Sequence, residues 1–169
     1  KIFALLTMTG FFLNPTHLIN AQPVFDEVAE KVGLKFTHYN GMTGKFFLPE
    51  IMGAGVAVFD YDNDGDLDIY LVQGNVLEST DKPDSTKFPW RDAVSPRGRL
   101  FRNELQLDKN GARTIQFSDV TEKSGIVATG YGMGVAVGDI NNDALPDVLV
   151  TEYGAARLFQ NEGNARFRE

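Results

Sequence analysis

The sequence predicts an all-β fold that comprises about two blades of a β-propeller, each made of four short antiparallel strands. Three observations lead to this prediction: an acidic loop of nine residues occurs twice, short apolar runs flank each copy, and a Leu-Phe phrase follows each copy. The flanking runs are β-branched and too short for helices, so they predict strands. A repeat of four short strands is the pattern of a propeller blade.

The first acidic loop spans residues 60–68 and places five carboxylates in nine residues: Asp60, Asp62, Asp64, Asp66 and Asp68. Carboxylates this close repel one another unless a cation lies among them. Gly65 permits a sharp turn, so that the side chains at loop positions 1, 3, 5 and 9 can surround one ion together with the backbone carbonyl of Asp66 at position 7.

Oxygen ligands without His or Cys suit a hard cation, so this loop predicts a calcium site in preference to a magnesium site. An EF-hand is excluded, because position 12 is Leu71 instead of Glu and the flanks predict strands instead of helices. A solvated acidic turn without an ion is the alternative, since Asp, Asn and Gly are common turn residues.

The second acidic loop spans residues 139–147 and repeats the spacing of the first. Asp139, Asn141, Asp143 and Asp147 take positions 1, 3, 5 and 9, and Leu145 takes position 7. Asn141 removes one charge, and Ala144 stands where the first loop has its turn glycine, so a residue with a Cβ must adopt a conformation that suits glycine. We expect this second site to bind calcium more weakly than the first; a purely structural loop is the alternative.

The repeat extends beyond the two loops. Residues 100–104, Leu-Phe-Arg-Asn-Glu, return at 158–162 as Leu-Phe-Gln-Asn-Glu, and the phrase that begins at Phe117 echoes the one that begins at Phe25. The same phrase starts again at Phe167. We therefore expect a strand at each of these phenylalanines, and Gly33 to end a helical turn after the first of them.

The phrase Met-Gly-Ala-Gly-Val-Ala-Val-Phe at residues 52–59, which runs into the first acidic loop, resembles an FG-GAP/VCBS repeat. Residues 25–28, 36–41 and 48–53 are similar to the N-terminal part of the ASPIC/UnbV (cartilage acidic protein-like) family. The resemblance runs from about residue 24 to the end of the sequence. It implies an integrin-α-like propeller with Ca²⁺ in hairpin loops, in an extracellular binding or adhesion module without catalytic groups.

Residues 1–21 have the features of a signal peptide: Lys1 followed by an apolar run over residues 2–13 and a possible cleavage site near Ala21. Asn14 and Pro15 interrupt the apolar run before it reaches the length of a membrane span, and an uncleaved anchor is the alternative. We therefore expect a secreted, cell-surface or periplasmic protein whose repeats occupy residues 22–169, with no membrane span after cleavage.

The lack of cysteine and the net negative charge exclude some classes of stabilising bond and of binding partner. Cysteine is absent, which excludes disulfides and leaves calcium as the expected stabiliser of an exported chain. The formal net charge of −7 argues against nucleic acid and anionic lipid as partners. We expect an extracellular protein or glycan ligand, or, as the alternative function, a structural assembly subunit that completes its propeller or open sheet edge with other chains.

Two further segments and one residue have competing interpretations. The insertion at residues 73–99 contains Trp90, which either contacts a ligand or pins the insertion to the domain, and we favour the second interpretation. The glycines of residues 130–134 precede a predicted strand, which favours close backbone packing near the propeller's centre over phosphate binding. His38 either contacts a ligand or has a structural role, and a single histidine more often has a structural role.

Catalysis is not expected. Carboxylates that bind calcium stay ionised and are poor general acids. Outside the predicted signal peptide His38 is the only histidine, and the sequence contains no cysteine, so neither a Ser-His-Asp set nor a Cys-His pair is indicated.

Overall fold

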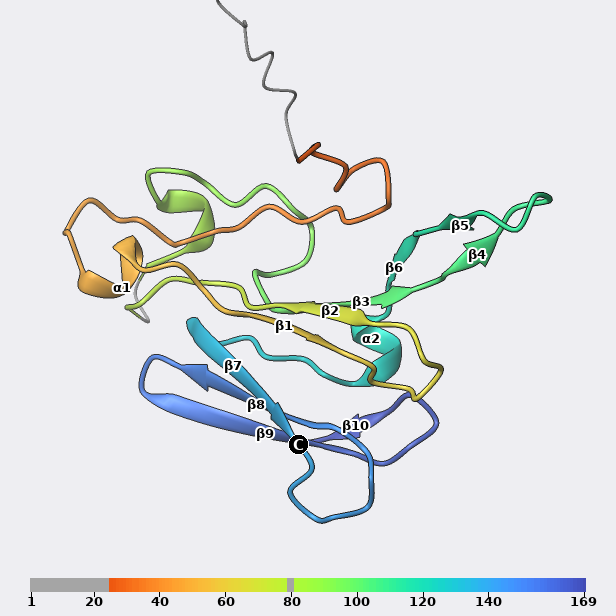
Figure 1. Ribbon diagram of the computed structural model, residues 1–169. Helices are drawn as coiled ribbons and strands as arrows, with labels where there is room; N and C mark the ends of the chain where they lie inside the picture. The colour runs from red at the N-terminus through yellow and green to blue at the C-terminus, as the bar shows by residue number, and fades with distance from the viewer. Residues whose placement is uncertain (1–24, 79–80) are drawn as a thin grey trace, which may run out of the picture.

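The computed structural model describes residues 25–78 and 81–169, and two four-stranded antiparallel sheets dominate it (Figure 1). The first sheet has the strand order β1 (Val56–Phe59), β2 (Asp68–Leu71), β3 (Arg99–Asn103) and β6 (Phe117–Asp119). The second has the order β7 (Gly132–Gly138), β8 (Asp147–Glu152), β9 (Ala155–Asn161) and β10 (Phe167–Arg168). The all-β prediction is confirmed; the predicted signal peptide, residues 1–21, lies outside the described residues.

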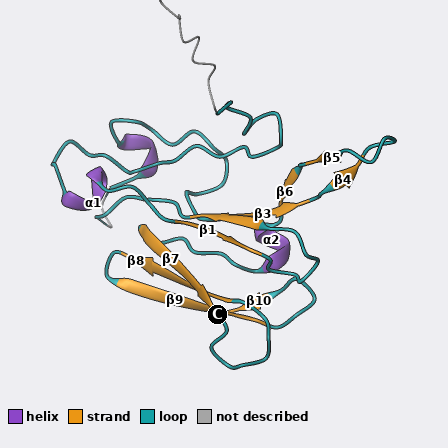
Figure 2. Cartoon of the chain, viewed as in Figure 1, coloured by secondary structure: helices purple, strands orange, loops and turns teal. Residues whose placement is uncertain are grey.

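The other elements are short (Figure 2). A two-stranded hairpin, β4 (Gln106–Leu107) and β5 (Arg113–Thr114), projects between β3 and β6. The helices are α1 (Leu48–Ile51), the 3-10 helix η1 (Pro83–Ser85) and α2 (Thr121–Ser124). Within residues 25–78 and 81–169, no helix is long and apolar enough to cross a membrane.

The repeated phrases form equivalent strands. Each acidic loop connects the first two strands of its sheet, which pair as Val58 with Ile69 in one sheet and Val137 with Val148 in the other. Each Leu-Phe phrase lies in the third strand, and the phrases that begin at Phe117 and Phe167 give the fourth. The prediction that strands flank the acidic loops is confirmed.

The strand predicted at Phe25 is wrong. Residues 25–28 have no regular structure, and the Phe25 side chain is 91 % exposed. Among the described residues no strand pairs with this segment, so its backbone groups lack the partners that β6 and β10 find. The helical turn does form, with hydrogen bonds from Val32 N to Val28 O and from Leu34 N to Ala29 O, and Gly33 follows it at φ 88°.

The core lies between the two sheets. Tyr70 and Leu100 of the first sheet are fully buried, and they belong to one apolar cluster with Val148, Val150 and Phe159 of the second. Full burial of one such side chain stabilises the fold by about 1.5–3 kcal/mol. Inter-sheet packing is therefore the main source of apolar stabilisation for both repeats.

Equivalent residues of the two sheets differ in exposure. Tyr70 and Leu100 are 0 % exposed, whereas their counterparts Leu149 and Leu158 are 37 % and 42 % exposed. On the opposite face of the first sheet Val56 is 59 % exposed, whereas its counterpart Val135 packs against the core. Tyr70 and Leu100 lie on the face of the first sheet that packs on the second sheet. The equivalent face of the second sheet, which carries Leu149 and Leu158, has no sheet packed on it among the described residues.

The lead-in before β1 and the insertion after β2 pack together beside the first sheet (Figure 1). Lys87 N donates to Met42 O at 2.8 Å, and the Tyr39 hydroxyl donates to Pro83 O at 3.0 Å. Gln73 joins both segments, because its side chain accepts from Tyr39 N and donates to Thr37 O. The insertion is therefore held by the lead-in.

Glycines mark the close approach of β1 and β7. A Cβ added at Gly55 would lie 3.0 Å from Gly134 Cα and 3.0 Å from Val135 N, both backbone atoms that cannot rotate away. A Cβ at Gly132 would lie 2.6 Å from the carbonyl oxygen of Gln73. The prediction that the glycines around residues 130–134 serve close backbone packing agrees with these distances.

Gly55→Ala should therefore destabilise the protein by about 1–3 kcal/mol, the usual cost of overpacking. Gly53→Ala is the matched control, since a Cβ at Gly53 meets no atom within 4 Å. Urea unfolding of both variants measures the difference. Equal stabilities would contradict the close approach of the two strands.

Candidate metal centre in the first acidic loop

Local hydrogen bonds shape the first acidic loop. The Asp60 carboxylate accepts from Asp64 N at 3.1 Å and from Gly65 N at 2.9 Å, and the Asp64 carboxylate accepts from Asp66 N at 3.0 Å. Asn63 and Gly65 take positive φ values of 57° and 90°. Asn and Gly tolerate this region best, so the sequence itself favours the turn.

The carboxylate at position 9 fixes the loop to the sheet. Asp68 is 0 % exposed and accepts from Tyr61 N at 3.0 Å and from Asn103 N at 2.8 Å. The Asn103 side chain donates to Leu67 O at 3.2 Å. The asparagine of the Leu-Phe phrase therefore closes the loop from the third strand, a role that sequence reasoning missed although the phrase itself was found.

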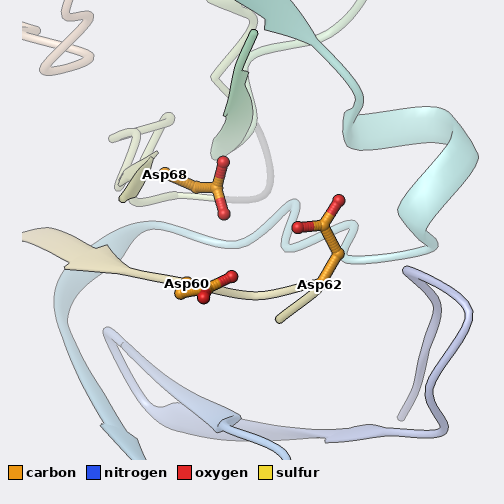
Figure 3. A group of neighbouring side chains, drawn as sticks. All are labelled: Asp60, Asp62 and Asp68. Atoms are coloured by element: carbon orange, nitrogen blue, oxygen red, sulfur yellow. The ribbon is translucent and has the colours of Figure 1, made fainter. Parts of the chain in front are cut away.

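Three of the predicted ligands converge (Figure 3). Asp60 follows the last residue of β1, Asp68 begins β2, and Asp62 lies in the loop between them; one oxygen of each lies within 4.8 Å of the others. The Asp62 side chain is only 10 % exposed, and its Oδ1 is buried with no hydrogen-bond partner among the described residues. A buried carboxylate oxygen without a donor is costly unless a cation lies beside it. The donor set therefore fits calcium, which takes carboxylate oxygens.

Burial dominates the protonation of this cluster. It raises the pKa of Asp68 to about 6, against the opposing effect of its hydrogen bonds from Asn103 N and Tyr61 N. Burial also raises the pKa of Asp62, and the neighbouring carboxylates add to the effect. The fold thus brings together carboxyl groups that ionise more readily once a cation is present.

The other predicted ligands of the first loop do not join the three carboxylates. The Asp64 carboxylate is bound instead to Arg102, whose Nη2 lies 2.9 Å from its Oδ2. Partial burial acts to raise the pKa of Asp64, but the hydrogen bonds from Arg102 and Asp66 N outweigh it and the pKa is lowered. Asp64 therefore does not join the three converging carboxylates in this structure, because Arg102 on the third strand holds it, and its role as a calcium ligand stays a prediction. The backbone carbonyls of Asp66 and Leu145 stay predictions.

The second loop folds in the same way. Asp139 accepts from Asp143 N and Ala144 N, as Asp60 does from its counterparts. Asp147 is 1 % exposed and accepts from Ile140 N and Asn161 N, as Asp68 does from its own loop and third strand. The loop spacing therefore specifies one backbone structure in both repeats.

Position 6 of the second loop carries the expected strain. Ala144 has φ 67°, where Gly65 of the first loop has φ 90°. The sequence prediction that a residue with a Cβ takes a glycine-like conformation is confirmed.

Position 3 separates the two loops chemically. The Asn141 side chain donates to the Asp143 carboxylate at 2.7 Å, so an amide hydrogen bond replaces the repulsion between two acids. Among the residues that the structure describes, the only group of three converging His, Cys, Asp or Glu side chains is in the first loop. Weaker calcium binding by the second loop stays a prediction.

The two loops touch. Asn161 donates to Tyr61 O at 2.8 Å, and the Tyr61 ring stacks on Phe167 with 6.2 Å between ring centroids. Asn63 also donates to Ala144 O at 3.5 Å. The second sheet and its acidic loop therefore contact the first loop directly.

A cavity of about 840 Å³ lies between the lead-in and the insertion. Its aromatic lining is Phe36, Tyr39, Phe88 and Trp90. Trp90 is half-buried: its Nε1 donates to Val94 O at 2.7 Å and its ring centroid lies 5.5 Å from that of Tyr39. The tryptophan thus contacts the lead-in, as the pinning interpretation expects, and also lines the cavity. His38 lines it too, with a pKa that burial lowers.

A scan of the chain against protein-family models found no match, and a search of the curated proteins found no significant match. The resemblance to FG-GAP/VCBS repeats and to the ASPIC/UnbV family therefore stays a prediction.

The pKa of Asp68 predicts how stability depends on pH in a calcium chelator. A carboxyl with a folded-state pKa of about 6 and an unfolded value near 3.8 holds its proton more tightly in the folded state. Protonated Asp68 therefore stabilises the folded state in full below about pH 4. This stabilisation, about 3 kcal/mol at most, is lost as the pH rises through about 6.

This loss should be measurable as the difference between the wild type and Asp68→Asn, whose amide does not titrate. Urea unfolding from about pH 4 to 7 gives the free energy of unfolding of both proteins. Parallel pH profiles would contradict the assignment of the raised pKa to Asp68.

The two loops also predict opposite effects of exchanging the position 6 residues. Ala144→Gly relieves a left-handed alanine and should stabilise the protein by about 0.5 kcal/mol, the strain relief less the added entropy of the unfolded chain. Gly65→Ala introduces that strain and should destabilise it by about 1 kcal/mol. A Cβ at Gly65 meets no atom within 4 Å, so backbone strain alone is tested. Thermal melts in chelator that shift in the same direction for both variants would contradict this account.

Proposed function

We propose that this chain is a calcium-binding β-propeller module for extracellular binding or adhesion, in which Ca²⁺ rigidifies the hairpin of the first acidic loop. The observation that carries the proposal is the convergence of the Asp60, Asp62 and Asp68 carboxylates, one of which, Asp62, has a buried oxygen with no hydrogen-bond partner among the described residues. A bound cation supplies the positive charge that this oxygen lacks.

The chemistry of the donors supports calcium over a transition metal. All three converging groups are carboxylates. Transition metals such as zinc favour Cys and His ligands, and the sequence has no cysteine. Extracellular calcium modules bind at about 10⁻⁴ to 10⁻³ M, so such a site is filled outside the cell. At a few times its Kd, each site adds roughly 1 kcal/mol to the stability of the fold.

The uncovered sheet faces support the propeller arrangement. Ala136, Leu149 and Leu158 are the counterparts of the residues by which the first sheet packs on the second, and all three are exposed. A further sheet that packed on this row in the same way would continue the stack, and a propeller is such a stack closed into a ring. If the same packing is repeated until the ring closes, the last sheet packs on the exposed face of the first sheet, which carries Val56 and Val58 of β1.

The cavity between lead-in and insertion supports a binding role. It combines exposed aromatic surface, with Phe88 65 % exposed, and the polar groups of His38, Arg91 and Gln73. Apolar walls with a few polar groups are typical of ligand sites. The partner proposed for it is an extracellular protein or glycan.

The same uncovered faces favour a second candidate function, a structural assembly subunit whose missing sheets come from other chains. Among the described residues, β1, β6, β7 and β10 are the edge strands of the two four-stranded sheets, and an edge strand can pair with a strand of another chain. Light scattering in calcium separates the two: a monodisperse monomer supports the self-contained module, and defined oligomers support the assembly subunit.

The calcium proposal predicts that Asp62→Asn or Asp62→Ala lowers the melting temperature in calcium. In chelator the same substitutions should leave it unchanged or slightly raised, because they remove a buried carboxylate oxygen that has no donor. Thermal melts of the full chain in excess calcium and in chelator measure both effects.

Asp108→Asn is the matched control. Asp108 lies in the β4–β5 hairpin, and its carboxylate accepts from Asn110 N and Ala112 N in a turn outside both acidic loops. Its substitution should change both melts equally. Equal losses with and without calcium for the Asp62 variants would refute the proposed calcium site.

A further inference from the structure

Arg102 supplies the first acidic loop with a cation of its own. It lies on β3, which pairs with β2, and its Nε lies 2.9 Å from Asp62 Oδ2 while its Nη2 lies 2.9 Å from Asp64 Oδ2. The Nη2 contact is a hydrogen bond, whereas the Nε hydrogen does not point at Asp62, so that contact is an ion pair only. The carboxylates of Asp62 and Asp64 raise the pKa of Arg102 further.

The second loop explains why the first needs this arginine. In the third strand of the second sheet the counterpart of Arg102 is Gln160, which accepts from Arg168 at 2.8 Å. The second loop has Asn141 at position 3, and its amide donates directly to Asp143. Asp62, at position 3 of the first loop, is an acceptor when ionised and cannot donate to Asp64. The guanidinium of Arg102 fills that role from the neighbouring strand.

We propose that Arg102 competes with calcium for the first loop and so sets the calcium concentration at which that loop fills. The inference rests on the proposed function. In a full calcium loop the carboxylate at position 5 is a ligand, and in this structure Arg102 holds that carboxylate, Asp64. The guanidinium therefore keeps the loop folded without metal and must release Asp64 when calcium binds.

The arginine has room to move. Its side chain is 36 % exposed, and a third, longer contact joins its Nη1 to Glu104 at 3.9 Å. Glu104 lies just after β3, and this contact offers the displaced guanidinium another carboxylate. The exchange is thus a side-chain movement within a fixed sheet.

Arg102→Gln, which copies the second repeat, should bind calcium about tenfold more tightly at the first loop, because it removes a positive charge that repels the ion. The same variant should melt at a lower temperature than the wild type in chelator, since Asp62 and Asp64 then repel each other without compensation. Isothermal titration calorimetry with calcium chloride gives the Kd, and thermal melts of the full chain give the second effect.

Two variants sharpen the test. Arg99→Gln removes the same charge from the same strand, but Arg99 pairs with Asp119, away from the loop, so its calcium Kd should change by less than about twofold at moderate ionic strength. Arg102→Lys keeps the charge and loses the planar fork that spans two carboxylates, so its Kd should lie between those of the wild type and Arg102→Gln.

The outcomes separate this inference from the proposed function. Calcium binding with the same Kd in the wild type and Arg102→Gln, or weaker binding by the variant, overturns the role of Arg102 and leaves the calcium site standing. No binding by any protein up to about 10 mM calcium, above the range of extracellular modules, overturns both. Tighter binding by Arg102→Gln but not by Arg99→Gln supports the inference.

Discussion

The buried carboxylate at position 9 of each acidic loop holds each repeat together. Asp68 accepts one N–H from its own loop and one from the third strand, and Asp147 does the same in the second repeat. Each of these carboxylates therefore joins a loop, a hairpin and a neighbouring strand. Since both are almost fully buried, a lost partner would leave a charged acceptor without compensation. The acidic loop is thus a structural part of the sheet as well as a candidate metal site.

The two loops reduce the repulsion between their acidic side chains in different ways. The second loop replaces one acid by an amide, which donates to its neighbour. The first loop keeps both acids and takes a guanidinium from the next strand. The first solution preserves more carboxylates for a cation, and one of them, Asp62, retains a buried oxygen with no donor among the described residues. The two loops therefore have the same backbone structure and differ in the number of carboxylates that can bind a cation.

The contact between the sheets links the site to the rest of the fold. Tyr61 follows Asp60 in the first loop, yet its ring stacks on Phe167 and its carbonyl accepts from Asn161 of the second sheet. Movement of the first loop therefore disturbs inter-sheet packing. On the other side of the first sheet, the lead-in and the insertion form an aromatic cavity, so the candidate metal site and the candidate ligand cavity lie in separate parts of the molecule.

The sequence by itself determined the local structure of both repeats. The Asp spacing with Gly65 predicted the loop, because the carboxylates form local hydrogen bonds and glycine tolerates positive φ. Ala144 was predicted to take a glycine-like conformation for the same local reason, and the flanking strands were predicted because the apolar runs are β-branched and too short for helices.

Only the tertiary structure decided which side chains meet. Arg102 is 38 residues from Asp64 and reaches it only because β3 pairs with β2. Asn161 is 100 residues from Tyr61. Phe25 repeats the phrase of Phe117 and forms no strand, because a strand needs a hydrogen-bonded neighbour that no local pattern provides. Loop geometry depends on adjacent residues, whereas the Arg102 ion pairs and strand pairing depend on contacts between distant ones.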